Sequence, residues 1–194
     1  MNDSDLKAIK EAFEKLEESL NDNKKKLAEL RRQLFKIEVS DYTFTAQDGS
    51  QVRLSDLFGS SDELLLIHNM GKGCVYCTLW ADGFNGVYQH LENRAPFVVV
   101  SPDDHETQRE FYNSRDWKFR MLSSQGTSFF KDLGFESSRG GPLPGVSTFS
   151  KSTDGKIFRV SSAYFGPGDD YCNLWHLFDL LPNGINDWSP KYKY

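Results

Sequence analysis

The sequence is poor in cysteine, in long apolar runs and in excess basic charge. Only three of the 194 residues are cysteine, an odd and small number that argues against an extracellular disulfide framework and favours a reducing, cytoplasmic compartment. No apolar run approaches membrane-spanning length, and the acidic start at residues 1–5 has no apolar core like that of a secretory signal. The formal net charge of −5 makes nucleic acid and anionic membranes unexpected partners.

Residues 1–38 contain the most regular pattern in the chain. Apolar side chains recur every seventh residue, with a second apolar position three residues after each; the set is Leu6, Ile9, Phe13, Leu16, Leu20, Leu27, Leu30, Leu34 and Ile37. This spacing predicts one long amphipathic, coiled-coil-like helix. Asn23 occupies a position on the stripe, and the weak helix formers at 21–23 allow a kink or a reversal there. The helix either packs on its own domain, pairs with a second copy as a homodimer, or docks on a different protein.

Residues 39–194 alternate between short strand-like and helix-like segments. The spacing predicts an α/β sandwich with three layers and a central mixed sheet. The expected elements are a hairpin at 42–45 and 51–54, a short helix or turn at 55–58, strands at 64–70, 97–100 and 117–123, helices at 75–91, 106–112 and 128–133, a second hairpin at 146–150 and 156–160, and a last helix at 169–181.

Cys74 and Cys77 lie where an apolar strand hands over to a helix. A thiolate at a helix N-terminus faces unpaired backbone N–H groups and the positive end of the helix dipole, so the pKa of Cys74 should fall. Lys72 adds a positive charge nearby. Two cysteines three residues apart can close a disulfide, with Cys74 as the attacking sulfur and Cys77 as the resolving thiol.

Two other interpretations of the pair remain open, because a Cys-x-x-Cys also occurs in metal sites and in inert cores. No second pair exists in the chain, whereas structural zinc takes four ligands. Cys172, His68 and His176 are the alternative source of ligands, but nothing in their spacing requires a metal. We therefore predict neither a metal nor a cofactor.

Several residues near the pair are candidate supporting groups. His68 is either a proton relay or a core histidine. Asp82 is either a proton acceptor for the buried thiol or a solvent-facing carboxylate. Tyr76 is placed to face a substrate. Cys172 is a third redox thiol or a plain buried cysteine.

A cysteine pair at the first parallel strand-to-helix junction resembles the thioredoxin superfamily, and particularly its peroxiredoxin-like branch, the alkyl hydroperoxide reductase and thiol-specific antioxidant proteins. The sequence resembles still more closely a bacterial thioredoxin-like family known as domain of unknown function 899. The segments that carry the two likenesses are 44–58, 119–123, 129–134 and 149–157 for the first, and 31–34, 68–70, 77–86 and 145–149 for the second. The resemblance covers most of the chain and implies a thioredoxin-like fold.

The chain departs from these families at positions that matter for activity. Peroxidases of the superfamily have Pro and Thr or Ser before the reactive cysteine, where this chain has Ile67 and Gly71. They also have an Arg near the position of Gly145, and Arg139 is a poor substitute. Thioredoxins have a Trp before the first cysteine, Gly-Pro between the two and a cis-Pro facing them; the corresponding residues here are Gly73, Val75–Tyr76 and Val146, with Pro144 two residues early.

We therefore expect a thiol-disulfide oxidoreductase that acts on an unknown disulfide substrate or redox partner protein. A redox-silent protein that binds a metal or a partner is the first alternative. A thiol peroxidase is the second, because a thiolate without positioned donors poorly stabilises the departing oxygen.

Overall fold

The structure is a computed structural model that describes residues 2–33 and 36–194. The chain divides into two compact units, 1–36 and 37–194. The first contains helix α1 (Asp3–Gln33), which is continuous through residues 21–23, so the suggested kink or reversal there was wrong. Acidic residues in its first turn and basic residues in its last complement the helix dipole, and the weak helix formers each cost less than about 0.7 kcal/mol.

The predicted stripe does not continue through the whole of residues 1–38. Leu34 falls outside the described residues. Ile37 belongs to strand β1 (Ile37–Val39) and pairs with Arg159, so its place in a helical stripe was wrong. The helical segment was expected to end at residue 38, but strand β1 includes that residue and belongs to the second unit, which begins at Ile37.

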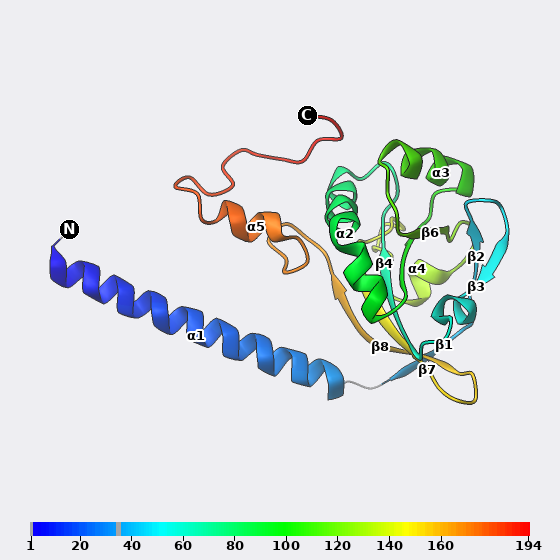
Figure 1. Cartoon of the computed structure of the whole chain (residues 1–194), viewed down its shortest axis with the longest axis horizontal. Coiled ribbons are helices and arrows are strands. Elements are labelled where there is room, and N and C mark those ends of the chain that lie inside the picture. Colours follow the sequence, from blue (N-terminus) through cyan, green and yellow to red (C-terminus); the bar gives the residue numbers. More distant parts are fainter. Residues whose placement is uncertain (1, 34–35) are drawn as a thin grey trace. The chain divides into compact units, whose positions relative to one another are not determined.

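The second unit, 37–194, contains the alternation of strands and helices that the sequence predicts (Figure 1). After β1, its elements are β2 (Thr43–Ala46), β3 (Gln51–Arg53), the 3-10 helix η1 (Leu54–Phe58), β4 (Glu63–His68), α2 (Val75–Arg94), β5 (Phe97–Ser101), α3 (His105–Ser114), β6 (Arg120–Ser123), α4 (Phe129–Asp132), β7 (Gly145–Lys151), β8 (Ile157–Tyr164) and α5 (Asn173–Phe178). The last helix is shorter than the predicted 169–181.

One mixed sheet organises this unit, with the strand order β1-β8-β7-β4-β5-β6-β2-β3. Strands β4, β5 and β6 are parallel, and the other pairings are antiparallel. Their βαβ connections run through α2 and α3, so the carboxyl ends of the three parallel strands meet at one edge of the sheet. The loop that carries the cysteines follows β4, which lies in the interior of the sheet between β7 and β5.

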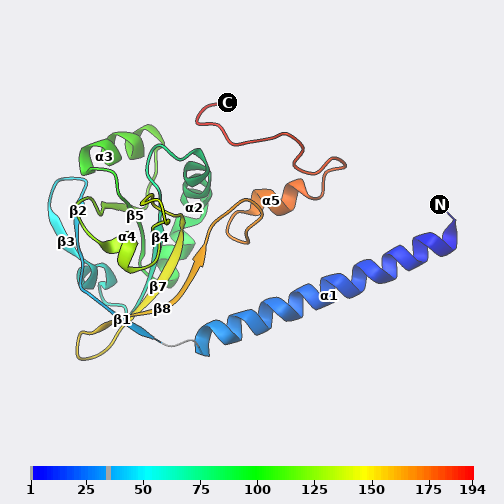
Figure 2. The same ribbon diagram turned by 180° about the vertical axis from the view of Figure 1, so that it is seen from behind.

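Alternate residues of the parallel strands face two separate cores. Leu64 and Leu66 of β4 point into a core that includes Phe129 of α4, whereas Ile67 of the same strand points into a core that includes Trp80 of α2. Helices α2 and α4 therefore cover opposite faces of the sheet (Figures 1 and 2). This is the predicted three-layer arrangement, and the period of two along each strand produces it.

Among the described residues, no helix is long and apolar enough to cross a membrane.

Candidate redox site

Cys74 is the residue that caps the N-terminus of α2. Its backbone is extended, and its Sγ accepts a hydrogen bond from the Cys77 backbone N–H at 3.1 Å. A sulfur in this position satisfies one of the N–H groups that the first helical turn leaves unpaired. Cys74 is half-buried and both cysteines are free thiols. The predicted strand-to-helix placement is therefore what the structure shows.

This environment lowers the pKa of Cys74 from an ordinary value of 9.0 to about 6. The largest cause is a hydrogen bond from the Cys77 thiol to the Cys74 sulfur, and the backbone N–H groups of Cys77 and Tyr76 add to it. Partial burial opposes the shift without cancelling it. Lys72, proposed from the sequence as a source of positive charge, is not among these causes.

Cys77 has the opposite character. It is 2% exposed and its pKa is raised, because its thiol is the hydrogen-bond donor to Cys74, because it is buried, and because the Cys74 charge lies close by. The Met70 backbone N–H donates to Cys77 Sγ at 3.4 Å, a contact that favours the Cys77 thiolate. One cysteine is thus ionised near neutral pH while the other keeps its proton.

The loop between β4 and α2 has a backbone that only glycine accommodates at one position. Gly71 has a φ of 99°, and a Cβ there would lie 2.5 Å from Asp103 Oδ1. Asp103 accepts a hydrogen bond from the Lys72 backbone N–H at 2.7 Å, and burial raises the pKa of its carboxyl. Asn69 Oδ1 accepts from the Gly71 N–H at 2.8 Å, so side chains on both sides of the loop fix the approach to Cys74.

Lys72 contributes its backbone rather than its side chain. Its N–H binds Asp103, and its carbonyl oxygen accepts a hydrogen bond from the Tyr192 hydroxyl at 2.9 Å. Tyr192 therefore reaches the loop from 120 residues further along the chain. Burial raises the pKa of the Tyr192 hydroxyl, and the charge of the cysteine pair raises it further.

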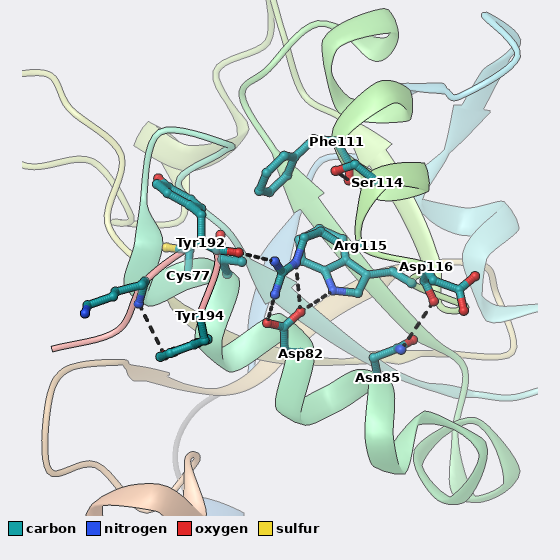
Figure 3. A network of polar contacts seen from close by, with 12 residues as sticks. Cys77, Asp82, Asn85, Phe111, Ser114, Arg115, Asp116, Tyr192 and Tyr194 are labelled. Atoms are coloured by element: carbon teal, nitrogen blue, oxygen red, sulfur yellow. Dashed lines mark hydrogen bonds and ion pairs between the residues drawn. The ribbon is translucent and has the colours of Figure 1, made fainter. Parts of the chain in front are cut away.

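Asp82 lies further along α2 and is engaged away from the thiols. Its carboxylate forms an ion pair with Arg115 and accepts a hydrogen bond from the Trp117 indole N–H at 2.8 Å. Arg115 also donates to the backbone oxygen of Tyr192 at 2.7 Å (Figure 3). Both interpretations made from the sequence, a proton acceptor for Cys77 and a solvent-facing carboxylate, miss this pairing.

His68 faces the other core. Its ring stacks on Phe135 with centroids 3.7 Å apart, and its Nε2 lies 2.8 Å from the Ser147 hydroxyl oxygen. The residue is fully buried, and burial holds its pKa well below its usual range. The structure thus places His68 as a neutral core histidine on the sheet face opposite to Cys77, and no hydrogen bond described in the structure joins it to either thiol.

Tyr76 and Cys172 belong to the core on the α2 side of the sheet. The Tyr76 ring lies 6.3 Å from those of Trp80 and Trp175, and Tyr76 is half-buried rather than presented freely to solvent. Cys172 is 6% exposed, and burial raises the pKa of its thiol. A low-pKa third thiol is therefore not what this environment produces.

The structure gives a reason for the absence of the peroxidase arginine near Gly145. A Cβ on Gly145 would lie 2.3 Å from the Ala163 carbonyl oxygen, so no arginine fits there. Arg139 is exposed in a turn. No peptide bond among the described residues is cis, and so the bond before Pro144 is trans. Across residues 2–33 and 36–194, no group of three or more His, Cys, Asp and Glu side chains is arranged to hold a metal.

Together, the mixed sheet, the parallel β4-β5-β6 core and the cysteine at the start of α2 define a thioredoxin-like protein with the fold of the peroxiredoxins. More particularly, the chain belongs to DUF899, described as a bacterial protein of unknown function, which matches residues 3–194. Compared with curated proteins, the chain gives no significant match.

Solved structures of peroxiredoxins are similar to this chain. Peroxidoxin BcpB from Mycobacterium tuberculosis has a TM-score of 0.52 and 27% identity, over 66% of this chain and 84% of that chain. A reduced peroxiredoxin from Vibrio vulnificus, solved with hydrogen peroxide, has a TM-score of 0.55 and 16% identity, over 70% and 87%. A peroxiredoxin-like protein from Aquifex aeolicus has a TM-score of 0.52 and 16% identity, over 66% and 74%. The last two likenesses concern the fold alone.

The sequence did not identify Asp103, Arg115 or Tyr192 as parts of this site. No local pattern links these residues to the cysteines, since their contacts span 31 to 120 residues of sequence. The carboxyl-edge position of Asp103, after β5, is the one feature from which its role was open to prediction.

Proposed function

We propose that this protein is a thiol-disulfide oxidoreductase in which Cys74 is the nucleophile and Cys77 the resolving thiol. The observation that carries the proposal is the opposite ionisation of the two cysteines. Cys74 has a pKa of about 6 and is half-exposed, whereas Cys77 is buried and holds its proton against the Cys74 sulfur. The thioredoxin-like fold supports it, because this is the strand-to-helix junction where that fold carries redox cysteines.

In the first step the Cys74 thiolate attacks one sulfur of a substrate disulfide. A bond forms between Cys74 and that sulfur, the substrate S–S bond breaks, and the second substrate sulfur leaves as a thiolate that takes a proton from water. The leaving thiolate carries away the negative charge. The Cys74 sulfur is then neutral and no longer accepts the strong hydrogen bond from Cys77.

In the second step Cys77 attacks the mixed disulfide. Loss of the Cys74 charge removes two of the causes that raise the pKa of Cys77, and the Met70 N–H remains to stabilise its thiolate. Cys77 loses its proton to solvent, and its attack on Cys74 forms the Cys74–Cys77 disulfide while the mixed disulfide bond breaks. The substrate leaves as a thiolate, which takes up a proton and becomes a thiol. The substrate has gained two electrons and the protein has lost two, so turnover requires a thiol reductant to regenerate the pair.

Single-cysteine variants test these roles. We expect Cys74→Ser to abolish exchange with a small disulfide, Cys77→Ser to accumulate a mixed disulfide on Cys74 that mass spectrometry detects, and Cys172→Ser to behave as the wild type. Exchange that survives in Cys74→Ser would reject the assignment. Absence of any reversible oxidation in the wild type would favour the redox-silent alternative, a scaffold that binds a partner.

Thiol peroxidase activity is a second candidate, favoured by similarity to the peroxidoxin of M. tuberculosis at 27% identity. Alkyl peroxide reduction activity is also ascribed to the bacterioferritin comigratory protein of Xanthomonas campestris, which has the same fold. The Cys74 thiolate would attack the peroxide, become a sulfenic acid and release an alcohol or water, after which Cys77 would form the disulfide and release water.

The chain offers the peroxide fewer donors than the peroxidases of this superfamily do, because Ile67 and Gly71 replace the Pro and the hydroxyl residue, and Gly145 excludes an arginine. Hydrogen peroxide consumption with dithiothreitol as donor, compared between the wild type and Cys74→Ser, decides this candidate. Turnover that exceeds disulfide exchange would make peroxide reduction the main activity.

A further inference from the structure

The segment at residues 189–194, here called the strap, is attached to the redox site at several points. Pro190 is buried. The Tyr192 hydroxyl donates to the Lys72 carbonyl oxygen at 2.9 Å, and the Tyr192 backbone oxygen accepts from Arg115 at 2.7 Å. The Tyr192 ring also packs edge-on against Phe111, with centroids 6.2 Å apart. The strap therefore lies against the residue two positions before Cys74.

The attachment forms a closed circuit that begins and ends at the redox helix. Cys74 starts α2, and Asp82 on the same helix holds Arg115. Arg115 donates a hydrogen bond to the Tyr192 backbone oxygen (Figure 3). The Tyr192 hydroxyl in turn donates to the loop that precedes Cys74. Asp82 binds Nε and Nη2 of the Arg115 guanidinium. Because this fixes the guanidinium plane, Nη1 donates to the strap without further loss of side-chain freedom.

Little of the cysteine pair beside the strap is exposed to solvent. Cys77 is 2% exposed and Cys74 is half-buried, although a thiol must be approached along the line of the bond it will form. A small disulfide such as glutathione disulfide needs one free approach to Cys74. A disulfide in a folded protein brings a wide surface that must also occupy the space next to the 71–73 loop, where Tyr192 lies.

We propose that the strap restricts the Cys74–Cys77 pair to low-molecular-weight disulfides and that a protein disulfide reacts only after the strap is displaced. This inference rests on the proposed function, since it names the substrate class of the same site. A protein disulfide reacts only after the hydrogen bonds of Tyr192 are broken, which slows its exchange, whereas a small disulfide reacts with those bonds intact.

Removal of residues 190–194 tests the proposal in the otherwise complete chain, with glutathione disulfide and insulin as the two probes. We expect insulin exchange to rise about tenfold, the factor that corresponds to loss of one or two such hydrogen bonds, while glutathione disulfide exchange changes less than about threefold. Tyr192→Phe, which removes only the hydroxyl, should give a smaller rise in insulin exchange. Tyr194→Phe is the matched control, because Tyr194 is 85% exposed and its hydroxyl bonds within the strap, and it should change neither rate.

Equal increases for the two probes, or no increase for insulin, would overturn the proposal. Alkylation of Cys74 separates this failure from failure of the proposed function, because it needs no redox turnover. Removal of the strap should increase the rate at which a polyethylene-glycol maleimide modifies Cys74 much more than the rate at which iodoacetamide modifies it. If no variant exchanges with either disulfide but this size-dependent increase in alkylation is found, the size restriction by the strap is supported and the oxidoreductase assignment is rejected.

A second and independent observation concerns α1, whose charge is divided between its two halves. Residues 3–18 contain six acidic and three basic side chains, a net charge of −3, and residues 19–33 contain two acidic and five basic ones, a net charge of +3. No α1 residue is buried, and the apolar stripe runs along both halves; its described members are Leu6, Ile9, Phe13, Leu16, Leu20, Leu27 and Leu30.

We infer that α1 pairs with α1 of a second copy in antiparallel orientation. An antiparallel pair buries the two stripes against each other and places each acidic half beside the partner's basic half. A parallel pair buries the same stripe but places like charges together, within a Debye length of about 10 Å. Opposed helix dipoles favour the antiparallel arrangement as well.

Sedimentation of the full chain tests the pairing, and we expect a dimer. Leu16→Glu on the stripe should give a monomer, and Glu18→Gln, off the stripe, should leave the dimer intact. A monomeric wild type would overturn the inference and leave α1 to its own domain or to a different protein.

Orientation follows from a spin label on Ser4→Cys in a chain whose three native cysteines are serine. At 1.5 Å per residue, an antiparallel pair that is aligned at its midpoint separates the two labels by roughly 40–45 Å, and a parallel pair brings them within about 20 Å. The shorter distance would overturn the antiparallel arrangement.

Discussion

Replacing Cys77 tests the origin of the low Cys74 pKa, which its thiol is expected to control. A hydrogen bond to a charged group contributes about 1.5–3 kcal/mol, and a thiol is a weak donor, so the lower end applies. At about 1.36 kcal/mol per pKa unit, Cys77→Ala should raise the pKa of Cys74 by about one unit. Cys77→Ser keeps a donor of similar size, and a hydroxyl is a better one. The Cys74 pKa should therefore stay near 6 in Cys77→Ser and rise to about 7 in Cys77→Ala.

The assay is the rate of iodoacetamide reaction at Cys74 as a function of pH, with the modified residue identified by mass spectrometry. At pH 7 a pKa of about 6 leaves roughly 90% thiolate, where a pKa of 9.0 would leave about 1%. The lower basicity reduces the intrinsic reactivity of the thiolate about 20-fold over three units, so the net gain in rate is only about fourfold. The pH midpoint is thus a sharper measure than the rate.

Two results would refute the reasoning. A midpoint that stays near 6 in Cys77→Ala would assign the shift to the helix N-terminus and its backbone N–H groups instead. A midpoint that rises equally in Cys77→Ala and Cys77→Ser would show that the donor on the side chain is not what matters.

Three further predictions concern the surroundings of the pair. The depressed pKa of His68 means that the folded protein disfavours protonation of this ring, so the free energy of unfolding should fall by up to about 1.4 kcal/mol per pH unit as the pH drops below 6.5. In His68→Gln, urea unfolding should show that this part of the pH dependence is lost. An unchanged pH dependence in the variant would contradict the prediction. Asp82→Asn should cost about 1–2 kcal/mol in the same measurement, because the ion pair with Arg115 is partly buried, and should leave the Cys74 midpoint unchanged; slower closure of the Cys74–Cys77 disulfide would instead restore Asp82 as a proton acceptor. Gly71→Ala should destabilise by about 1–3 kcal/mol through its positive φ and the contact with Asp103, and near wild-type stability would show that the loop adapts.

The order of strands and helices was predictable because it depends on local patterns. The apolar runs of β4 and β5, the turn at 48–49 and the glycine-punctuated helices are visible in the sequence. Strand β1 was not, because three residues that follow a helical stripe contain no alternation of their own. It exists through its pairing with β8, which is a long-range contact.

The position of the cysteine pair was equally predictable, and its partners were not. A strand followed by a helix fixes where Cys74 lies, and this alone indicates the direction of its pKa shift. The period of two along β4 also assigns His68 to the sheet face opposite to Ile67, and so to the core away from Cys77, but only once the faces that α2 and α4 cover are known. Arg115 and Tyr192 join the site through the tertiary fold.

The hydrogen bond from the Met70 amide to Cys77 Sγ gives the molecule a built-in spectroscopic reporter. When Cys77 joins a disulfide, its S–H bond is replaced by an S–S bond and the electron density on its sulfur changes, while the Asn69 side-chain amide still donates to the Cys77 carbonyl oxygen. The Met70 amide resonance and its exchange with deuterium should therefore follow the oxidation state of the pair without any label. A single backbone proton would then allow titration of the redox couple, in purified protein and in living cells alike.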